Sequence, residues 1–384
     1  MRVALITDGV WPYVLGGMQK HSYFLCKYLA KNKIYVDLFH FNQSAYKIEL
    51  LEFFTEEERN FINSFVVDFP SGLKFPGHYI YKSYLYSKQI GKLLLQSESK
   101  YDFIYTKGLT GWYMLTQLKQ NKFSTANIGV KFHGYEMFQK APNFITKLQH
   151  IFLLRYPVKK ITRKADVVFS YGGKITEIIK LLGVPLNRIV ELPSGIEEQS
   201  LVNNISESKG ARKFIFLGRY ERRKGVEELN QAIKKIIELD ELNNKIEFHF
   251  IGPIPDSKKI IHPIVIYHGE IRDKSLLQKT LCEGDVLICP SWSEGLPNVI
   301  LEAMASGLAV IATDVGATSI LVSETTGWLL PSNDKYVLTE VILEAAKCSN
   351  HELNSKKRNA LYHVKEHFNW NNIIHQFINK CLVK

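Results

Sequence analysis

The sequence has few cysteines and no long uncharged stretch. The five cysteines, at positions 26, 282, 289, 348 and 381, form no Cys-x-x-Cys pair and no metal-ligand spacing, which is typical of free thiols in a reducing compartment. The longest stretch without Asp, Glu, Lys or Arg runs from Phe368 to Asn379 and is too short to span a bilayer. Because the amino terminus enters a strand pattern at once, we expect no signal peptide and a cytoplasmic protein.

Acidic residues are scarce relative to basic ones. The chain has 49 Lys and Arg against 38 Asp and Glu, a net charge of +11, which favours an anionic ligand or surface. We do not expect nucleic acid as a partner, because the sequence lacks a helix-turn-helix, a zinc knuckle and an aromatic RNA-binding motif. The segment Asp8–His21 also lacks the Gly-x-Gly-x-x-Gly that a nicotinamide-dependent oxidoreductase on two Rossmann-like domains would need.

Strand and helix patterns alternate along the 384 residues. This alternation predicts an α/β fold with parallel sheets covered by helices on both faces. The strand patterns are Arg2–Thr7, Tyr35–Phe41, Phe103–Tyr105, Ile128–Phe132, Val167–Ser170, Ile189–Leu192, Lys213–Leu217, Ile246–Ile251, Ile264–Tyr267, Val286–Cys289 and Leu308–Ala312. The helical patterns include Gly17–Asn32, Lys174–Leu182, Tyr336–Cys348 and His351–His367.

The length of the chain suggests two domains. We expect an amino-terminal domain at 1–195 and a carboxyl-terminal domain at 196–367, followed by a final helix at 368–384 that crosses back to the first domain. A Phe-rich segment at about 42–78 breaks the alternation and indicates an insertion. The polar run Val202–Ala211 indicates a linker.

The segment from Glu294 to Glu302 carries the most informative pattern. It follows the apolar strand pattern Val286–Cys289 and precedes small residues that end at Gly307, where glycine is typical of a helix stop. The segment is therefore predicted to form a turn and the start of a helix at the carboxyl end of a buried strand, where α/β folds bind ligands. Two solvated glutamates on a surface helix are the alternative reading.

Pro297 is predicted to occupy the first helical position, where its missing N–H costs nothing. The amides of Asn298, Val299 and Ile300 would then point out of a helix end that carries partial positive charge and favours phosphate. Glu302 would lie about one turn into this helix, where a carboxylate can accept hydrogen bonds from two ribose hydroxyls.

This strand, turn and helix resembles the signature of the family 4 retaining glycosyltransferases, which have the GT-B fold. The resemblance implies two facing, doubly wound Rossmann-like domains with a cleft between them. The amino domain would bind the acceptor and the carboxyl domain a nucleotide-sugar donor. Glu302 would bind the ribose and Glu294 would lie near the donor sugar, while Gly295 and Leu296 would contact the diphosphate.

Arg219 and Lys224 follow the apolar strand pattern Lys213–Leu217. Arginine offers phosphate a rigid fork and lysine a point charge. The resemblance makes Arg219 and Lys224 the pair that holds the donor diphosphate, although Arg222 and Arg223 lie close by. A basic surface turn is the alternative.

Two further matches to this family lie in the first half. Gly16 and Gly17 open a helical pattern and would let the backbone approach a ligand closely; the resemblance places them near the diphosphate and acceptor. His133 follows the strand pattern Ile128–Phe132, and the resemblance places it at the donor sugar near the reacting carbon. The segment Pro193–Glu197 departs from the family pattern, so we assign it no role.

The expected reaction is transfer of a sugar from a nucleotide sugar, UDP-linked rather than GDP-linked, to a hydroxyl of a saccharide or lipid-linked saccharide. We expect no metal cofactor, because the chain has no Asp-x-Asp, the metal-carrying motif of the other large glycosyltransferase fold. Cell-surface polysaccharide or glycolipid assembly would use such an enzyme. A nucleotide-sugar epimerase, a phosphorylase and an inactive GT-B binding subunit remain alternatives.

The stretch from Met137 to Ala165 has seven Lys or Arg residues and no acid. Within it an apolar stripe at helical spacing has Lys147 and Arg155 beside it; the stripe consists of Ile145, Leu148, Ile151 and Phe152. A basic amphipathic helix can lie on an anionic membrane, and packing of the stripe into the core is the equal alternative. Pro157 is expected to end the first helix.

Overall fold

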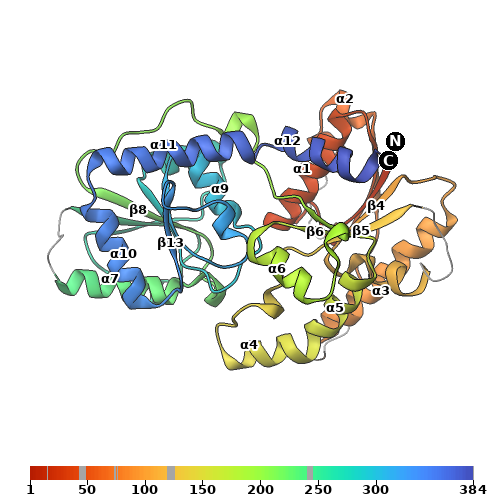
Figure 1. Cartoon of the computed structure of the whole chain (residues 1–384), viewed down its shortest axis with the longest axis horizontal. Coiled ribbons are helices and arrows are strands. Elements are labelled where there is room, and N and C mark those ends of the chain that lie inside the picture. Colours follow the sequence, from red (N-terminus) through yellow and green to blue (C-terminus); the bar gives the residue numbers. More distant parts are fainter. Residues whose placement is uncertain are drawn as a thin grey trace. The chain divides into compact units, whose positions relative to one another are not determined.

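The computed structural model describes residues 1–14, 16–42, 49–72, 75, 77–118, 126–239 and 245–383. The chain divides into two compact units. Unit 1 contains residues 1–138, 145–194 and 370–384, and unit 2 contains residues 139–144 and 195–369. Figure 1 shows strands and helices alternating within each unit.

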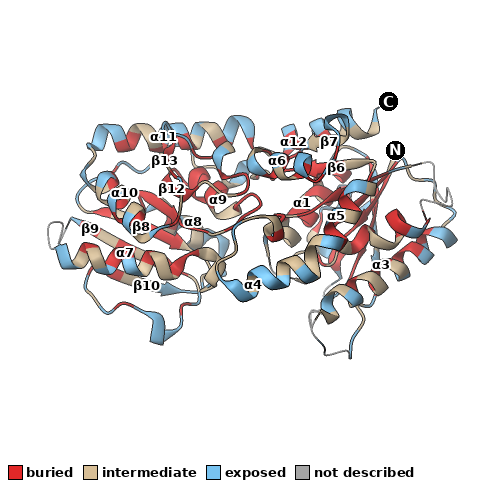
Figure 2. Cartoon of the chain, turned by 60° about the horizontal axis from the view of Figure 1, so that its bottom comes forward, coloured by how far each residue is buried: buried red, intermediate tan, exposed pale blue. Residues whose placement is uncertain are grey.

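Unit 1 is built on a parallel sheet with the strand order β3-β2-β1-β4-β5-β6-β7. The strands are β1 (Arg2–Ile6), β2 (Tyr35–His40), β3 (Ile62–Val66), β4 (Phe103–Lys107), β5 (Asn127–Lys131), β6 (Val167–Ser170) and β7 (Ile189–Glu191). The helices are α1 (Gly17–Lys31), α2 (Glu56–Arg59), α3 (His78–Gln96), α4 (Phe144–Gln149), α5 (Arg155–Lys164), α6 (Gly173–Leu181) and α12 (Trp370–Phe377). Figure 2 shows that the central strands of the sheet are largely buried, as expected for apolar strands covered on both faces.

Unit 2 repeats this architecture with the parallel strand order β10-β9-β8-β11-β12-β13. The strands are β8 (Arg212–Leu217), β9 (Ile246–Ile251), β10 (Val265–Gly269), β11 (Val286–Cys289), β12 (Ala309–Thr313) and β13 (Gly327–Leu330). The helices are α7 (Val226–Leu239), α8 (Lys274–Cys282), α9 (Asn298–Ala305), α10 (Lys335–Lys347) and α11 (Asn350–His367). Side chains of β8, β9 and β11 form the core with the apolar faces of α7 and α10.

The predicted α/β class with parallel sheets is confirmed, and two strands were missed. The segment read as an insertion at 42–78 contains β3, which pairs in parallel with β2. Only Ile62 of this strand is buried, and Phe65 is 41% exposed, so β3 lacks the continuous apolar run of a central strand. Residues 43–48, 73–74 and 76 of this segment lie outside the described residues. The second missed strand is β13, which begins at Gly327 at the edge of its sheet.

The run Val202–Ala211 was predicted to be a linker, but it lies within unit 2 and is hydrogen-bonded to it. The amide of Val202 donates to the carbonyl oxygen of Ala305 at 3.0 Å, and that of Ser208 donates to Oδ1 of Asn354 at 3.0 Å. The sequence could not show these partners, because they lie about a hundred residues or more further along the chain.

The expected helix end at Pro157 is also wrong. A π-helical turn, η6 (His150–Leu154), joins α4 to α5, and Pro157 lies buried in the first turn of α5. A proline there lacks an N–H and crowds the carbonyl four residues earlier, and a wider π turn accommodates such a defect. The basic stretch therefore continues as one helical segment.

Candidate active site

The turn between β11 and α9 holds the motif that begins at Glu294. Pro297 was predicted to be the first helical residue. It is instead extended (φ −72°, ψ 104°) and precedes α9. The amide of Ile300 donates to the carbonyl oxygen of Pro297 at 3.0 Å and is not free for phosphate, which corrects a second expectation. The amino end of α9 still offers the positive end of a helix dipole.

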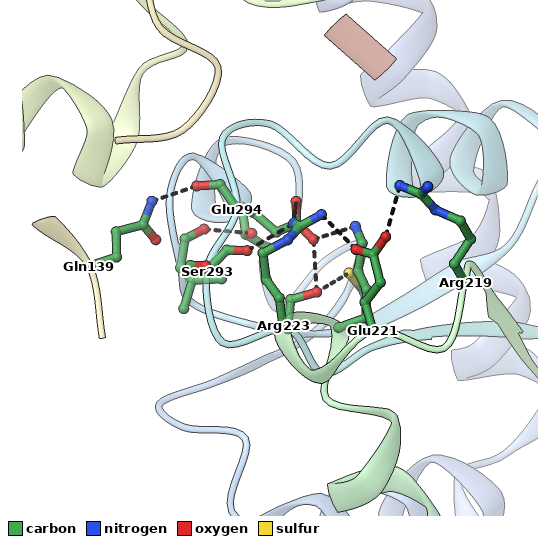
Figure 3. A network of polar contacts seen from close by, with 11 residues as sticks. Gln139, Arg219, Glu221, Arg223, Ser293 and Glu294 are labelled. Carbon is green, nitrogen blue, oxygen red and sulfur yellow. Dashed lines mark hydrogen bonds and ion pairs between the residues drawn. The ribbon is translucent and has the colours of Figure 1, made fainter. Parts of the chain in front are cut away.

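Glu294 is a buried carboxylate held by three side chains (Figure 3). Its Oε1 accepts from Nζ of Lys224 at 2.7 Å and from Oγ of Ser291 at 2.8 Å. Its Oε2 lies 3.3 Å from a guanidinium nitrogen of Arg223. The structure thus brings together two of the predicted catalytic residues, Glu294 and Lys224, in an ion pair.

Two opposing effects set the pKa of the Glu294 carboxyl. Burial raises it, but the charges of Lys224 and Arg223 and the hydrogen bonds from Lys224 and Ser291 outweigh burial and leave the pKa below its usual value. Glu294 is therefore ionised at neutral pH. It serves as the counterion of these cations, and it is not poised as a general acid.

Arg219 lies further out in the same network. Its guanidinium pairs with Glu221 at 2.8 Å, and its side chain is 72% exposed. Glu221 also pairs with Arg223 at 3.3 Å. The three cations and two carboxylates of this network, Arg219, Arg223, Lys224, Glu221 and Glu294, leave one positive charge in excess, which favours an anionic ligand.

Backbone contacts fix the turn that carries Glu294. Nε2 of Gln139 donates to the carbonyl oxygen of Glu294 at 2.7 Å (Figure 3), and the amide of Ala317 donates to that of Gly295 at 2.7 Å. Gly316 has a φ of +58°, and a Cβ there would lie 2.2 Å from the Glu294 carbonyl oxygen. Only glycine fits this close approach, so the turn is rigidly placed.

The other predicted donor residues of unit 2 follow along the same segment. Gly295 and Leu296 are buried in the turn, Asn298 is the first residue of α9, and Glu302 is half-buried one turn further on. The structure places all of these residues on one short strand–turn–helix. Their roles in binding the donor remain predictions.

In unit 1, Gly16 precedes α1 and Gly17 is its first residue. His133 is half-buried just after β5, and its Nδ1 lies 2.6 Å from the phenol oxygen of Tyr171. Burial lowers the pKa of His133 well below its usual value, and Lys107 and Lys131 lower it further. The imidazole is therefore neutral at neutral pH.

Sequence reasoning missed several residues of these sites. Arg223 rather than Arg219 contacts Glu294, and Ser291 donates to the same carboxylate. No spacing rule separates three neighbouring cations, so only the fold could identify Arg223. Lys131 had a detectable signal, since it is a lysine inside an apolar strand pattern, and Lys107 ends another buried strand.

The described residues contain no group of three or more His, Cys, Asp or Glu side chains placed to hold a metal ion. A polar cavity of about 360 Å³ lies in unit 2, beside the ring of Trp292 and the guanidinium of Arg222, which are 5.1 Å apart. None of the predicted donor residues is among the described residues that line this cavity. It is therefore a separate feature of unit 2.

Comparison with known proteins connects this geometry to a family. A family model described as "Glycosyl transferases group 1" matches residues 211–347, a range that includes Arg219, Lys224 and both glutamates of the motif. The putative teichuronic acid biosynthesis glycosyltransferase TuaC of Bacillus subtilis is 28% identical over 194 residues. This alignment covers 48% of this chain and 48% of that protein, so the chain spans about half the length of this relative.

Solved structures share the fold of the whole chain. Sucrose-phosphate synthase from Thermosynechococcus elongatus has a TM-score of 0.76 at 19% identity, with 98% of this chain and 97% of that chain covered. Anabaena HepE in complex with UDP and glucose has a TM-score of 0.66 at 16% identity, with 99% and 98% covered. The predicted resemblance to the group 1 glycosyltransferases is confirmed over residues 211–347, and the predicted GT-B-like fold is confirmed over the whole chain.

Proposed function

We propose that this glycosyltransferase moves a sugar from a nucleotide-sugar donor to a hydroxyl of a saccharide or lipid-linked saccharide, with retention of the anomeric configuration. The donor is a UDP-sugar, and the reaction belongs to cell-surface polysaccharide or glycolipid assembly. The name of TuaC, which refers to teichuronic acid biosynthesis, supports this setting. The complex of HepE with UDP supports the choice of base.

The observation that carries this proposal is the cationic network around Glu294. Lys224 and Arg223 are fixed by a buried carboxylate at 2.7 and 3.3 Å beside the amino end of α9, and Arg219 extends from the same network. Cations held in place before the reaction cost no reorganisation when charge develops. This is the arrangement that a departing nucleoside diphosphate needs.

In the proposed reaction, the bond between the anomeric carbon and the diphosphate oxygen breaks, and negative charge grows on the diphosphate. Arg219, Arg223 and Lys224 stabilise that charge, and Glu302 holds the ribose. The acceptor hydroxyl attacks the face from which the diphosphate departs, and its proton passes to the departing diphosphate oxygen as the new bond forms. Because three cations and a helix end supply the positive charge, the reaction needs no metal.

Substitution of the cations tests this proposal. Arg219→Ala and Lys224→Ala should each lower turnover by roughly two to three orders of magnitude, as loss of one fixed donor does elsewhere. Arg272→Ala is the matched control, because Arg272 is an exposed arginine (79%) that pairs with Glu270, which is outside the network around Glu294. Near-normal turnover in the Arg219→Ala/Lys224→Ala double variant would place the diphosphate elsewhere. Release of a free sugar isomer without acceptor would indicate an epimerase.

We also propose that the helical stretch from α4 to α5 docks on an anionic membrane surface. Ile145, Phe152 and Tyr156 are 70%, 76% and 69% exposed, and α4 is mostly exposed in Figure 2. This exposure argues against core packing of the stripe. Ile145, Leu148, Phe152 and Tyr156 recur every three or four residues, the spacing of one helix face. Ile151 of the predicted stripe is half-buried and does not belong to the exposed set.

Charge supports an anionic surface as the partner. Lys147 and Lys159 are exposed on this stretch, which contains no acid, and each basic residue near such a surface contributes about 1 kcal/mol. Arg155 and Arg163 donate to backbone carbonyl oxygens at 2.8 and 2.5 Å and hold the stretch in place. No described helix is long and apolar enough to cross a bilayer. Anionic lipids are enriched in the cytoplasmic leaflet, which would place the enzyme peripherally on the inner face of the membrane.

Flotation with liposomes tests the docking. Binding to anionic vesicles should exceed binding to neutral ones and should fall with salt. Phe152→Ser and Lys147→Glu should each weaken it. Leu181→Ser is the matched control, because Leu181 is an exposed leucine (86%) on a different helix of unit 1. Equal recovery with neutral and anionic vesicles would contradict the docking.

A further inference from the structure

Unit 1 contains a buried array of basic side chains that the proposed reaction does not use. Lys107 ends β4, Lys131 ends β5, and His21 faces both from α1. All three are essentially inaccessible to solvent, with exposures of 0%, 0% and 1%. We call them the Lys–His–Lys array. They lie at the carboxyl ends of the strands, the edge where α/β sheets bind ligands.

Short contacts join the three groups into one chain of hydrogen bonds. Nζ of Lys107 lies 2.9 Å from Nδ1 of His21, and Nζ of Lys131 lies 3.1 Å from Nε2 of the same ring. The remaining contacts are to backbone: Lys107 donates to the carbonyl oxygen of Met18 at 3.1 Å, and Lys131 donates to that of Leu192 at 2.5 Å. No carboxylate among the described residues accepts a hydrogen bond from either lysine.

Proton counting limits the charge of this array. A neutral imidazole has one N–H and one lone pair, whereas an ammonium group only donates. If both lysines were ammonium groups, one would face the N–H of His21, and two donors would oppose each other in a buried site. If His21 were protonated, both lysines would have to be amines. With both contacts formed, the array therefore holds at most one positive charge, whichever tautomer His21 adopts.

The surroundings indicate which lysine is neutral. Burial lowers the pKa of both lysines, but the charge of Asp8 raises that of Lys107, while Lys107 lowers that of Lys131 further. Lys107 therefore keeps the proton and donates to Nδ1 of His21. Nε2–H of His21 then donates to the lone pair of Lys131.

The array connects to His133 through Tyr171. Nζ of Lys131 lies 4.0 Å from the centre of the Tyr171 ring, and the phenol of Tyr171 lies 2.6 Å from Nδ1 of His133. The ring of His21 also meets that of His133 edge-on, with centroids 5.7 Å apart. The titratable groups around His133 in this cluster are His21, Lys107, Lys131 and Tyr171, with Asp8 beyond Lys107 and with Glu136, whose charge acts on Tyr171.

We propose that the Lys–His–Lys array, with one lysine neutral, is a positioning device that fixes His133 and keeps its imidazole uncharged. The single ammonium of the array repels a second proton, and Tyr171 fixes the ring. A neutral imidazole offers the same hydrogen bonds to a sugar hydroxyl over a wide pH range, whereas an exposed histidine changes charge near pH 6.5. This inference rests on the proposed function, with His133 at the donor sugar as the family resemblance implies.

Nitrogen NMR of the lysine side chains tests the charge count on the wild-type protein without substrate. One lysine Nζ should show the shift of a neutral amine at pH 7, and its signal should disappear in Lys131→Met. Ammonium shifts for every lysine of the folded protein would overturn the inference, even if the enzyme transfers sugar. A neutral lysine in a protein that transfers no sugar would instead leave the charge count standing and reject the proposed function.

The pH dependence of turnover tests the positioning role. Lys131→Met removes a neutral amine, so turnover between pH 5.5 and 8 should stay as flat as in the wild type. The Lys107→Met/Lys131→Met double variant removes the ammonium, so the pKa of His133 should rise. Turnover should then fall about tenfold per pH unit below that pKa. The histidine signals in NMR report the same change directly. A loss of turnover at low pH in Lys131→Met alone would refute the positioning role. Turnover that does not change with pH in the double variant, together with an unchanged titration of His133, would refute it as well.

Discussion

The ion pair between Lys224 and Glu294 leads to a specific prediction for Lys224→Met. Methionine fills a similar space without charge, so the substitution removes the closest partner of a carboxylate whose side chain is only 7% exposed. Lys224 itself is 19% exposed, so water cannot replace it fully. Glu294 would remain buried with Arg223 at 3.3 Å and Ser291 at 2.8 Å.

The expected loss of unfolding free energy in Lys224→Met follows from these contacts. Breaking a buried ion pair by removing one partner costs about 3–5 kcal/mol. Because two partners remain, we expect the lower end, about 3 kcal/mol of unfolding free energy. For a unit of this size, 1 kcal/mol shifts the melting temperature by roughly 2–4 °C, so unit 2 should melt roughly 6–12 °C lower. Arg219→Met is the matched control, because its pair with Glu221 is exposed (72% and 32%) and contributes about 0–1 kcal/mol.

The stability that the Lys224–Glu294 ion pair contributes depends on pH with a definite sign. The folded state lowers the pKa of Glu294, so the ion pair contributes stability above the unfolded pKa and loses it as pH falls through the folded pKa. In Lys224→Met, burial should raise the pKa of Glu294, and protonation should relieve the cost. The difference in melting temperature between wild type and Lys224→Met should therefore shrink from pH 7 to pH 4. Thermal unfolding measures this. A constant difference, or one no larger than for Arg219→Met, would refute the reasoning.

Three further predictions concern the same unit. Glu302→Ala should weaken donor binding by about 1.5–3 kcal/mol through loss of charged hydrogen bonds to ribose, as calorimetric titration can measure; unchanged affinity in a folded variant would remove Glu302 from the site. Gly316→Ala should displace the turn at Glu294, because its Cβ would lie 2.2 Å from a carbonyl oxygen, and should lower both stability and turnover; wild-type behaviour would show that the turn adapts. Turnover should persist in excess chelator, and loss of activity that magnesium or manganese restores would contradict metal independence.

Much of the fold was predictable because most strands of parallel sheets are buried on both faces and appear as apolar runs. Val286–Cys289 and Ile246–Ile251 were predicted with their observed bounds. The prediction missed two of the four edge strands that the structure describes: β3 has several exposed residues, and β13 begins with glycine. Polar residues interrupt the apolar pattern of β3, and glycine is uncommon in strands, so neither sequence shows a clear strand pattern.

The candidate site was predictable where its residues adjoin in sequence. Glu294 and Glu302 lie on one segment, and spacing alone placed them on a turn and a helix. The partner of Glu294 was harder to identify, because Arg222, Arg223 and Lys224 all lie on one helical turn, η9 (Arg222–Lys224). Their side chains diverge: Arg222 pairs with Glu228 at 2.7 Å, whereas the other two reach Glu294. The backbone sets the direction in which each side chain points from a helical turn, and residue type does not reveal that direction.

The place of α12 in unit 1 has a consequence for synthesis of the protein. Trp370 stacks on Tyr28 at 5.8 Å, and Phe377 packs on Phe103 and Tyr105 at 5.6 and 5.8 Å. Tyr28, Phe103 and Tyr105 belong to the first third of the chain, and α12, which covers them, is translated last. During translation, unit 2 can therefore complete its core while unit 1 still exposes an aromatic surface. A ribosome-bound or truncated chain that ends before Trp370 should need chaperone protection, although all strands of its sheet are already present.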